Sequence, residues 1–357
     1  MAIPRTENTF KLPDLDENKT PEKPKSIRLG TPRGRVTASN ARLLAFAGMF
    51  PGVDSESLSV LNRSQPSRIS AGGELMTVRG TEQYLRKLYN LDALEKFRDA
   101  VSGVTSYGLS KLGIAYAHEF DYDMTHAASL DGISIERLKH YRMIARVAAQ
   151  FASPAGFFKG SLGVEPVGLD QLISEHEMRA AFTPVQRQLV ENKKQGKSND
   201  YGKLRLELLK RALTDAQDGR IEWSNLLEAH PVLYTIGYPR RENSKLKYVH
   251  QPDLVINLDK DRKQKSQNIL VEVELNKKSW DQYDSILATL KSELDKPYVY
   301  ARAVYFTIGS GVETLLRKVD AAGDYKLFSS GKLTVLPICN RDGDPLRPAN
   351  RVRVQTH

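Results

Sequence analysis

The feature that most constrains this chain is a run at residues 269–275 in which apolar and acidic residues alternate. Successive side chains of an extended strand point to opposite faces, so Glu272 and Glu274 fall on one face and the apolar residues on the other. A second apolar run, 254–256, directly follows Asp253, and a polar loop separates the two runs. If the runs pair as a hairpin, Asp253 joins the two glutamates. Three neighbouring carboxylates repel one another unless a cation neutralises them, so the pattern predicts a divalent metal site.

Composition limits the class of protein. The chain has 357 residues, of which 40% are hydrophobic and 27% charged, so we expect a globular protein with two or three domains. We find no apolar run long enough to span a bilayer, no signal-peptide pattern, and a single cysteine, Cys339, which together predict a cytoplasmic protein with no membrane partner. Lys and Arg outnumber Asp and Glu by 53 to 43, a net charge of +10, which favours a polyanionic partner such as nucleic acid.

The sequence pattern predicts a multidomain α+β or α/β protein. Pro-rich and basic residues at 1–38 indicate a flexible basic arm, which either lies along DNA phosphates or is a solvated tail. A largely helical domain is expected over 39–153 and a linker rich in Gly, Pro and Phe over 154–170. A mixed α/β domain is expected over 171–345, followed by a tail over 346–357.

The first of these domains has the element order of a winged helix-turn-helix. Helical patterns at 41–46, 56–61 and 81–88 precede short strands around Gly103, and the passage 107–113 resembles the wing-to-helix segment of many bacterial members of that fold. In such a domain the third helix enters the major groove and the hairpin touches flanking phosphates. A winged helix used for protein contacts or dimerisation is the alternative. The candidate DNA contacts are Arg79, Arg86, Lys87 and Lys111.

Helical spacing at 134–152 indicates a connecting or dimerisation helix at the end of this domain, so the protein could form a homodimer. Beyond the linker, strand-like runs alternate with helical ones. A helix after the acidic strand is expected to begin with Ser279 and Gln282 as a capping box, and to present an apolar stripe from Trp280 to Leu294. The expected strands lie at 233–236, 254–256, 269–275, 299–306 and 333–336.

A first acid ahead of a hairpin and a second acid on the next strand resemble the PD-(D/E)xK nuclease superfamily, over roughly residues 170–310. The resemblance implies a restriction-endonuclease-like mixed sheet flanked by helices. It also implies an Mg²⁺- or Mn²⁺-dependent DNA endonuclease or nickase with Asp253, Glu272 and Glu274 as catalytic and metal-binding residues. Glu274 stands where the superfamily usually has lysine, although some members with an acid there remain active. Either Lys277 or Lys278 returns an ammonium group to the site, or both are solvated.

One further residue follows from the same resemblance, and a second, His250, from its position beside Asp253. The superfamily often adds an acid from a helix before the first strand, and Glu175 in the segment 172–179 is the candidate, with a plain surface charge as the alternative. His250 either orients a phosphate or water beside Asp253, as part of the nucleic-acid contact, or has a structural role.

A narrower resemblance spans most of the chain. The motifs Ser-Glu-x-x-Met-Arg, His-x-Pro-Asp-Leu-Val and Glu-x-Glu-Leu-x-x-Lys-Ser, behind a winged helix, resemble the replication-relaxation type proteins of actinobacterial plasmids, phages and integrated elements. The resemblance implies a bacterial, nucleoid- or plasmid-associated protein whose partners are DNA and other proteins of a replication, transfer or transposition complex. Two competing classes remain: a non-catalytic DNA-binding accessory protein with a degenerate nuclease-like domain, and a transcriptional regulator whose winged helix binds an operator.

Overall fold

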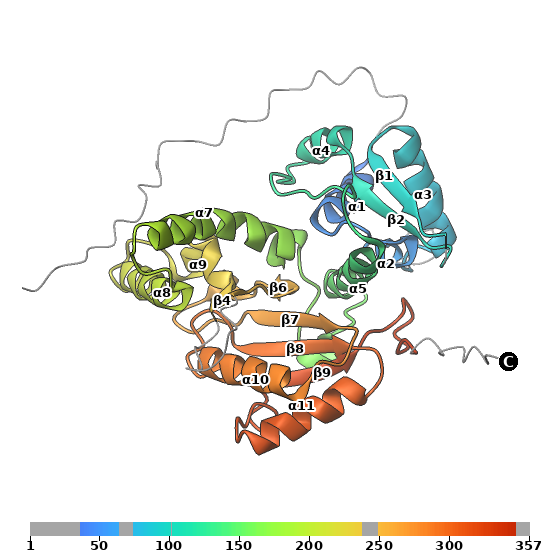
Figure 1. Cartoon of the computed structure of the whole chain (residues 1–357). Helices are drawn as coiled ribbons and strands as arrows, with labels where there is room; N and C mark the ends of the chain where they lie inside the picture. The colour runs from blue at the N-terminus through green and yellow to red at the C-terminus, as the bar shows by residue number, and fades with distance from the viewer. Residues whose placement is uncertain (1–35, 64–73, 101, 238–248, 348–357) are drawn as a thin grey trace, which may run out of the picture. The chain divides into compact units, whose positions relative to one another are not determined.

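The computed structural model describes residues 36–63, 74–100, 102–237 and 249–347 (Figure 1). These residues form a mixed α/β structure with a mixed sheet and surrounding helices, as the sequence predicted. The expected basic arm lies almost entirely outside the described residues, and so does the expected tail beyond residue 347. None of the helices in the described ranges is long and apolar enough to cross a membrane.

The N-terminal part combines helices with an antiparallel hairpin, β1 and β2. Its helices begin at side-chain caps, because Ser, Thr and Asp accept a hydrogen bond from an otherwise unpaired backbone N–H. Thr37, Asp54, Thr77, Ser110 and Ser134 serve in this way. The elements in chain order are α1 (Ala38–Met49), α2 (Ser55–Ser59), α3 (Val78–Asn90), β1 (Leu94–Arg98), β2 (Thr105–Leu109), α4 (Lys111–His118) and α5 (Ile135–Phe151).

The step from β2 into α4 depends on a close approach of two backbones. A Cβ atom added to Gly113 would lie 2.0 Å from the carbonyl oxygen of Ala93. Only glycine fits at such a distance, because a backbone oxygen cannot move away as a flexible side chain can. Gly113 therefore allows α4 to pack directly against the chain that enters β1.

A five-stranded mixed sheet occupies the C-terminal part, in the order β3-β6-β7-β8-β9. The pairs β3–β6 and β6–β7 are antiparallel, whereas β7–β8 and β8–β9 are parallel. Every residue of β7 is buried, as expected for a central strand covered on both faces. The strands are β3 (Leu172–Ser174), β6 (Leu254–Ile256), β7 (Ile269–Glu274), β8 (Arg302–Thr307) and β9 (Leu333–Pro337).

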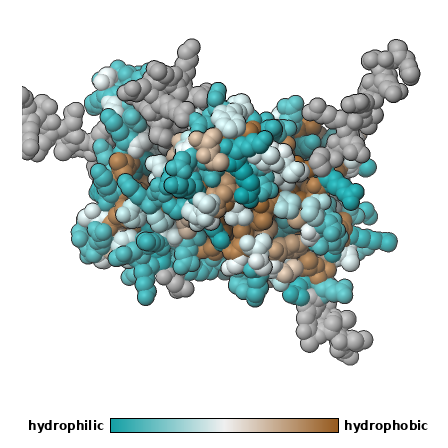
Figure 2. Space-filling model, turned by 90° about the horizontal axis from the view of Figure 1, so that it is seen from below, coloured by the Kyte–Doolittle hydropathy of each residue, from teal (hydrophilic) through white to brown (hydrophobic). Residues whose placement is uncertain are grey.

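Helices and short turns connect these strands. Ser279 and Gln282 form the predicted capping box at the start of α10, but Trp280 is 44% exposed, so the buried stripe of α10 begins at Tyr283. In Figure 1, α10 and α11 lie below the sheet. Figure 2 views that side, where hydrophilic side chains cover most of the surface and apolar ones lie between them. The elements are α6 (Lys159–Leu162), η1 (Leu169–Gln171), α7 (Glu175–Lys194), α8 (Tyr201–Gln217), η2 (Trp223–Asn225), α9 (Leu226–Ala229), η4 (Asp259–Asp261), α10 (Trp280–Leu294) and α11 (Gly311–Ala322).

One strand prediction is wrong. Residues 233–236 were expected to form a strand, yet the segment Pro231–Tyr234 is a 3₁₀ helix, η3. Pro231 lacks a backbone N–H for a strand ladder and its fixed φ suits the first turn of a helix. Only Ile236–Gly237 forms a strand, β4, which pairs with β5 (Val249–His250) in a separate two-stranded sheet.

The segment 154–170, predicted as a linker, packs against the core. The ring of Phe158 lies 4.2 Å from that of Phe151 on α5 and 5.3 Å from that of Phe306 on β8, measured between centroids. Leu162, at the end of α6, is also buried. These contacts join α5 to the sheet, and the division of the chain into domains stays a prediction.

Helix α5 is anchored by polar contacts at several points. Arg146 pairs with Asp54 at 3.2 Å and with Glu56 at 2.7 Å, and both acids belong to the start of α2. The Arg142 guanidinium donates to the hydroxyl of Ser106 on β2 at 3.2 Å. Helix α5 also contacts β7 of the central sheet. It therefore has a fixed position against both the N-terminal elements and the sheet.

Candidate functional site

Asp253 and Glu272 lie opposite each other across the β6–β7 hairpin. Leu254 pairs with Val271, so continuing the antiparallel register by one residue places Asp253 opposite Glu272. Opposite residues of antiparallel strands point to the same face of a sheet. Glu274, two positions further along β7, shares that face. The hairpin therefore brings to one face the three acids that the sequence singled out.

Neighbouring groups hold both members of the Asp253–Glu272 pair. The backbone N–H of Val273 donates to Oδ2 of Asp253 at 2.7 Å. Nε2 of His250 lies 2.5 Å from Oε1 of Glu272. The side chains of Asp253 and Glu272 are only 16% and 9% exposed. His250, predicted as a nucleic-acid contact, is therefore placed beside a buried acid of the site.

Lys278 approaches the same face. Its ammonium forms a close ion pair with the carboxylate of Glu274. The backbone N–H of Lys278 donates to the hydroxyl of Tyr283 at 3.3 Å, which helps to fix the turn before α10. Lys277 is exposed. Of the two lysines considered from the sequence, the structure brings Lys278 to the acids.

A histidine from α5 joins the acid pair. Nε2 of His140 lies 3.3 Å from Oδ1 of Asp253. This nitrogen is buried and makes no hydrogen bond within the described ranges. Because α5 packs on β7, the candidate site is built from two segments far apart in the sequence.

Burial shapes the protonation of these groups. It raises the pKa of Asp253 well above its usual value; the charges of Glu272 and Glu175 raise it further, while the Val273 N–H and Lys278 lower it. Burial lowers the pKa of His140, although Glu175 and Glu272 oppose that shift. Both shifts are toward the uncharged forms of the two groups. Perturbed groups that share a site in this way are typical of functional centres.

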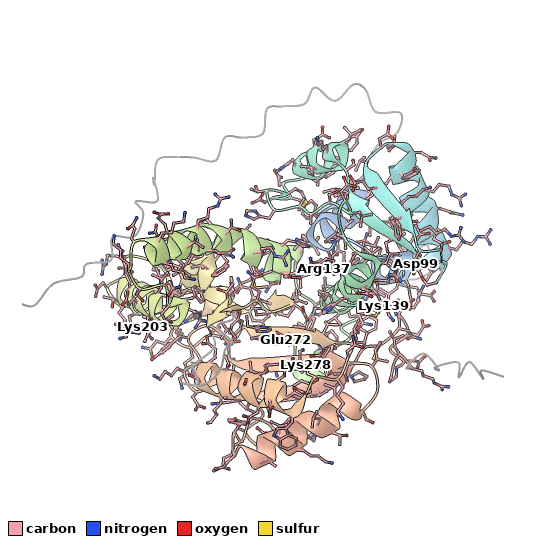
Figure 3. All side chains as sticks on the ribbon, in the orientation of Figure 1. Asp99, Arg137, Lys139, Lys203, Glu272 and Lys278 are labelled. Carbon is pink, nitrogen blue, oxygen red and sulfur yellow. The ribbon has the colours of Figure 1, made fainter. Side chains whose placement is uncertain are left out.

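Positive side chains surround the acids. Glu175 is the first residue of α7 and forms a close ion pair with Arg179, one turn further along the helix. Arg137 on α5 donates to the hydroxyl of Tyr141 at 3.1 Å. In Figure 3, Arg137 is labelled where α5, β7 and the start of α7 come together, close to Glu272 and Lys278. Both arginines are exposed. Arg137 interacts electrostatically with His140, and Arg179 pairs with Glu175, whose charge helps to raise the pKa of Asp253.

The predicted DNA contacts of the N-terminal part are exposed. Arg79, Arg86 and Lys87 follow one another on α3 at helical spacing, while Leu85 and Leu88 are buried on its other face. These three cations therefore lie on the solvent side of α3. Lys111 is also exposed, but it belongs to the first turn of α4.

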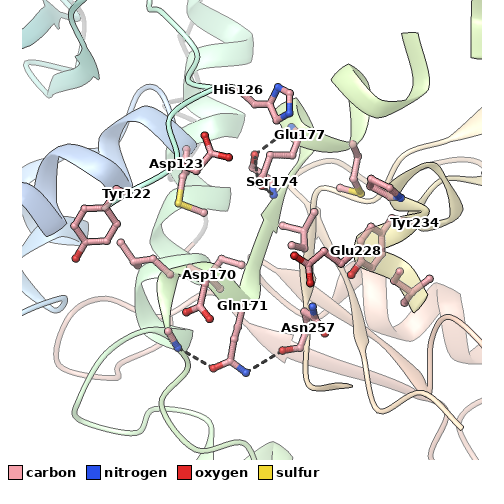
Figure 4. Close-up of a pocket in the computed structure, with 18 of the residues that line it drawn as sticks. Tyr122, Asp123, His126, Asp170, Gln171, Ser174, Glu177, Glu228, Tyr234 and Asn257 are labelled. Carbon is pink, nitrogen blue, oxygen red and sulfur yellow. Dashed lines mark hydrogen bonds between the residues drawn. The ribbon is translucent and has the colours of Figure 1, made fainter. Parts of the chain in front are cut away.

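A pocket of about 1110 Å³ lies apart from the acid pair: none of Asp253, Glu272 and Glu274 lines it (Figure 4). Several of its polar groups are bonded to one another. Glu177 accepts a hydrogen bond from the Ser174 N–H at 2.8 Å, as the capping box of α7 requires. The Gln171 amide donates to the Asn257 carbonyl at 3.0 Å and accepts from the Gly168 N–H at 3.0 Å. These bonds hold β3 and its neighbours in place, so we take the acid pair as the candidate site.

Two carboxylates are available to a cation at this site. Within the described ranges, no group of three or more His, Cys, Asp or Glu side chains is arranged to hold a metal ion. Mg²⁺ and similar ions usually keep several waters and take one or two carboxylates, which Asp253 and Glu272 can supply. The charge of Glu272 raises the pKa of Asp253, so a cation between the two acids would be favourable.

Comparison with known proteins gives no independent assignment. The chain matches no family model, no curated protein and no solved structure. The resemblances to PD-(D/E)xK nucleases and to replication-relaxation type proteins therefore stay predictions. The case for the candidate site depends on its own geometry, burial and charge.

His140 is the site residue that the sequence interpretation missed. Arg137, His140 and Tyr141 are spaced three and four residues apart, so they form a polar stripe on a helix whose later turns are almost entirely buried. That stripe was the available signal that one side of α5 faces a polar site. The partner of the stripe, the β6–β7 hairpin, could not be read from spacing along the chain.

Proposed function

We propose that this is a DNA-binding protein of a plasmid, phage or other mobile element, and that it cleaves DNA as a metal-dependent endonuclease or nickase. The observation that carries the proposal is the pair of Asp253 and Glu272, whose side chains are 16% and 9% exposed and which face each other across a hairpin, with the pKa of Asp253 raised well above its usual value. A buried carboxylate pair is unfavourable on its own and favourable around Mg²⁺ or Mn²⁺. The proposal includes a restriction-endonuclease-like fold for the central sheet.

The residues of the site have different roles in the proposed hydrolysis. Asp253 and Glu272 would hold the ion, which when bound neutralises charge on the phosphodiester and polarises it. The N–H of Val273 and the ring of His250 keep the two acids in place. In the reaction a water oxygen adds to phosphorus and one P–O ester bond breaks, which leaves a phosphomonoester and a hydroxyl group.

Lys278 takes the part that the superfamily assigns to a lysine on the strand. Its ammonium reaches the acid face from the turn after β7 and pairs with Glu274 there. A cation at this place can hold a phosphate oxygen or orient the attacking water. Glu274, in turn, keeps the flexible lysine side chain directed at the site. The exposed Arg137 and Arg179 would contact phosphates on either side of the cleaved bond.

DNA docking is assigned to the N-terminal elements, which we propose to be a winged helix. The order α1, α2, α3, β1, β2 supports this assignment, with α3 as the groove helix and the β1–β2 hairpin as the wing. The cations Arg79, Arg86 and Lys87 are exposed along α3. The hairpin adds Lys96, whose ammonium lies 3.8 Å from the ring centre of Tyr89 at the end of α3.

Replacing Arg86 and Lys87 together by alanine is expected to weaken DNA binding about tenfold or more, because each cation neutralises a phosphate. The slope of log affinity against log salt should fall by about 1 for each lost phosphate contact. Fluorescence anisotropy over a series of salt concentrations measures both. Lys203→Ala, an exposed lysine on α8, is the matched control. Unchanged affinity and slope in the double variant would exclude α3 as the docking helix.

The nuclease proposal is tested with the full chain and supercoiled plasmid. We expect nicked or linear DNA with Mn²⁺ or Mg²⁺ and intact plasmid with EDTA. Glu272→Gln, prepared in the same way, should be inactive, since it removes one charge from the pair without changing its size. Cleavage that persists in Glu272→Gln, or in EDTA, would show that this site does not carry the activity.

A second candidate is a non-catalytic DNA-binding accessory protein of a replication or transfer complex. Glu274 favours it, because this acid stands in the lysine position and engages the ammonium of Lys278. That protein would bind DNA, and its thermal stability would not respond to Mn²⁺ through Asp253 and Glu272. A transcriptional regulator, the third class, would instead require tight binding to one operator sequence.

A further inference from the structure

His140 comes from outside the hairpin that supplies the acids, and no part of the proposed cleavage uses it. Its Nε2 is buried and makes no hydrogen bond within the described ranges, and its nearest recorded polar contact is Oδ1 of Asp253 at 3.3 Å. A buried nitrogen without a hydrogen bond costs folding free energy. A bound ligand that accepts its proton or coordinates its lone pair would remove that cost.

The spacing of the two atoms suits neighbouring ligands of one ion. Two adjacent ligands at about 2.1 Å from an octahedral ion lie about 3 Å apart. Oδ1 of Asp253 and Nε2 of His140 are close to that separation at 3.3 Å. Oδ2 of Asp253 is occupied by the Val273 N–H, so Oδ1 is the oxygen that faces His140 and is left for an ion.

The position of His140 is fixed by the anchors of its helix. Arg142 and Arg146, further along α5, bind the side chains of Ser106, Asp54 and Glu56. A ligand on such a helix is presented with little conformational freedom, which favours ion binding. The site is thus composite, since its acids come from the sheet and its nitrogen from the helix that leaves the N-terminal elements.

We propose that His140 is a direct ligand of the divalent ion, next to Asp253, with Glu272 completing the set by a change of side-chain rotamer. This inference rests on the proposed function, because it concerns the same ion. An imidazole ligand moves the preference of an oxygen site away from Mg²⁺ and toward Mn²⁺ or Co²⁺. The protein should therefore bind Mn²⁺ more tightly than Mg²⁺, and His140 should be the source of much of that difference.

The test is Mn²⁺ binding to the full chain, followed by calorimetry and by pulsed electron paramagnetic resonance. Bound Mn²⁺ should show the ¹⁴N coupling of a coordinated imidazole in the wild type and in His118→Ala, a histidine on α4. His140→Ala should lose the coupling and bind Mn²⁺ about tenfold or more weakly, with a smaller loss for Mg²⁺. His140→Gln, which keeps an oxygen donor and similar size, should bind Mn²⁺ but show no ¹⁴N coupling.

The outcomes separate this inference from the proposed function. Mn²⁺ binding without ¹⁴N coupling in the wild type, or with coupling retained in His140→Gln, overturns the role of His140 and leaves the acid pair as the ion site. Coupling that disappears in His250→Ala instead would assign the nitrogen to His250 and also overturn the inference. Absence of Mn²⁺ binding to the wild type overturns both the inference and the metal-dependent nuclease.

Discussion

Asp253→Asn is expected to reduce DNA cleavage by about a thousandfold or more and, in the same protein, to stabilise the ion-free fold. Asparagine keeps the size of the side chain and an oxygen for the Val273 N–H, but it removes one of two facing charges. A carboxyl group whose pKa is raised on folding lowers stability at every pH above its unfolded value. Its neutralisation should raise the free energy of unfolding by on the order of 1–3 kcal/mol at neutral pH.

Divalent ions should offset or reverse the difference in stability between Asp253→Asn and the wild type. At an Mn²⁺ concentration 100 times the dissociation constant, the wild type should gain about 2.7 kcal/mol, whereas Asp253→Asn should gain far less. Urea denaturation with and without Mn²⁺ measures both effects, and plasmid cleavage is followed on the same samples. Asp281→Asn, at an exposed position in the first turn of α10, is the matched control. If Asp253→Asn cleaves plasmid at the wild-type rate, or if Mn²⁺ stabilises both proteins equally, Asp253 is not a ligand of the ion.

Arg146→Ala is expected to be the most destabilising of these substitutions, lowering the free energy of unfolding by about 3–5 kcal/mol. The side chains of Arg146 and Asp54 are each 8% exposed, and their ion pair is 3.2 Å long. Removing the guanidinium leaves Asp54 buried without its cation and also releases Glu56. Asp54 caps α2 as well, so the damage should extend to that helix.

Chemical denaturation monitored by circular dichroism measures the loss. Arg317→Ala is a suitable comparison, because Arg317 is 56% exposed and pairs with Glu313 one turn away on α11, where such pairs contribute less than about 1 kcal/mol. Arg146→Lys keeps the positive charge but not the planar guanidinium with its paired donors. Its loss in the free energy of unfolding should lie between those of Arg146→Ala and Arg317→Ala. A loss below about 1 kcal/mol for Arg146→Ala would mean that α5 is not held by this pair.

The hairpin of acids was the part of the fold most accessible from sequence. Alternation in 269–275 correctly predicted a strand, and the order of acid, apolar run and polar loop correctly predicted its antiparallel partner. The capping box at Ser279 also followed from local chemistry. These features depend on residues close together in the chain, so local rules are sufficient for them.

Features that depend on contacts between residues far apart in the sequence were not predicted. Residues 154–170 have a loop-like composition, yet Phe158 packs against Phe151 and Phe306. Trp280 fits an apolar stripe by spacing and is nevertheless 44% exposed. His140 reaches Asp253 only because α5 packs on β7. Sequence periodicity indicates which face of a helix is apolar or polar, but it does not indicate which strand packs against that face.

The central claim is that Asp253 and Glu272 form a divalent cation site, and a crystal of the full chain soaked with Mn²⁺ tests it most directly. We expect an anomalous density peak between the two carboxylates, within about 2.3 Å of an oxygen of each, and no such peak in Asp253→Asn. A fully occupied Mn²⁺ site elsewhere, together with an empty space between Asp253 and Glu272 at the same ion concentration, would contradict it.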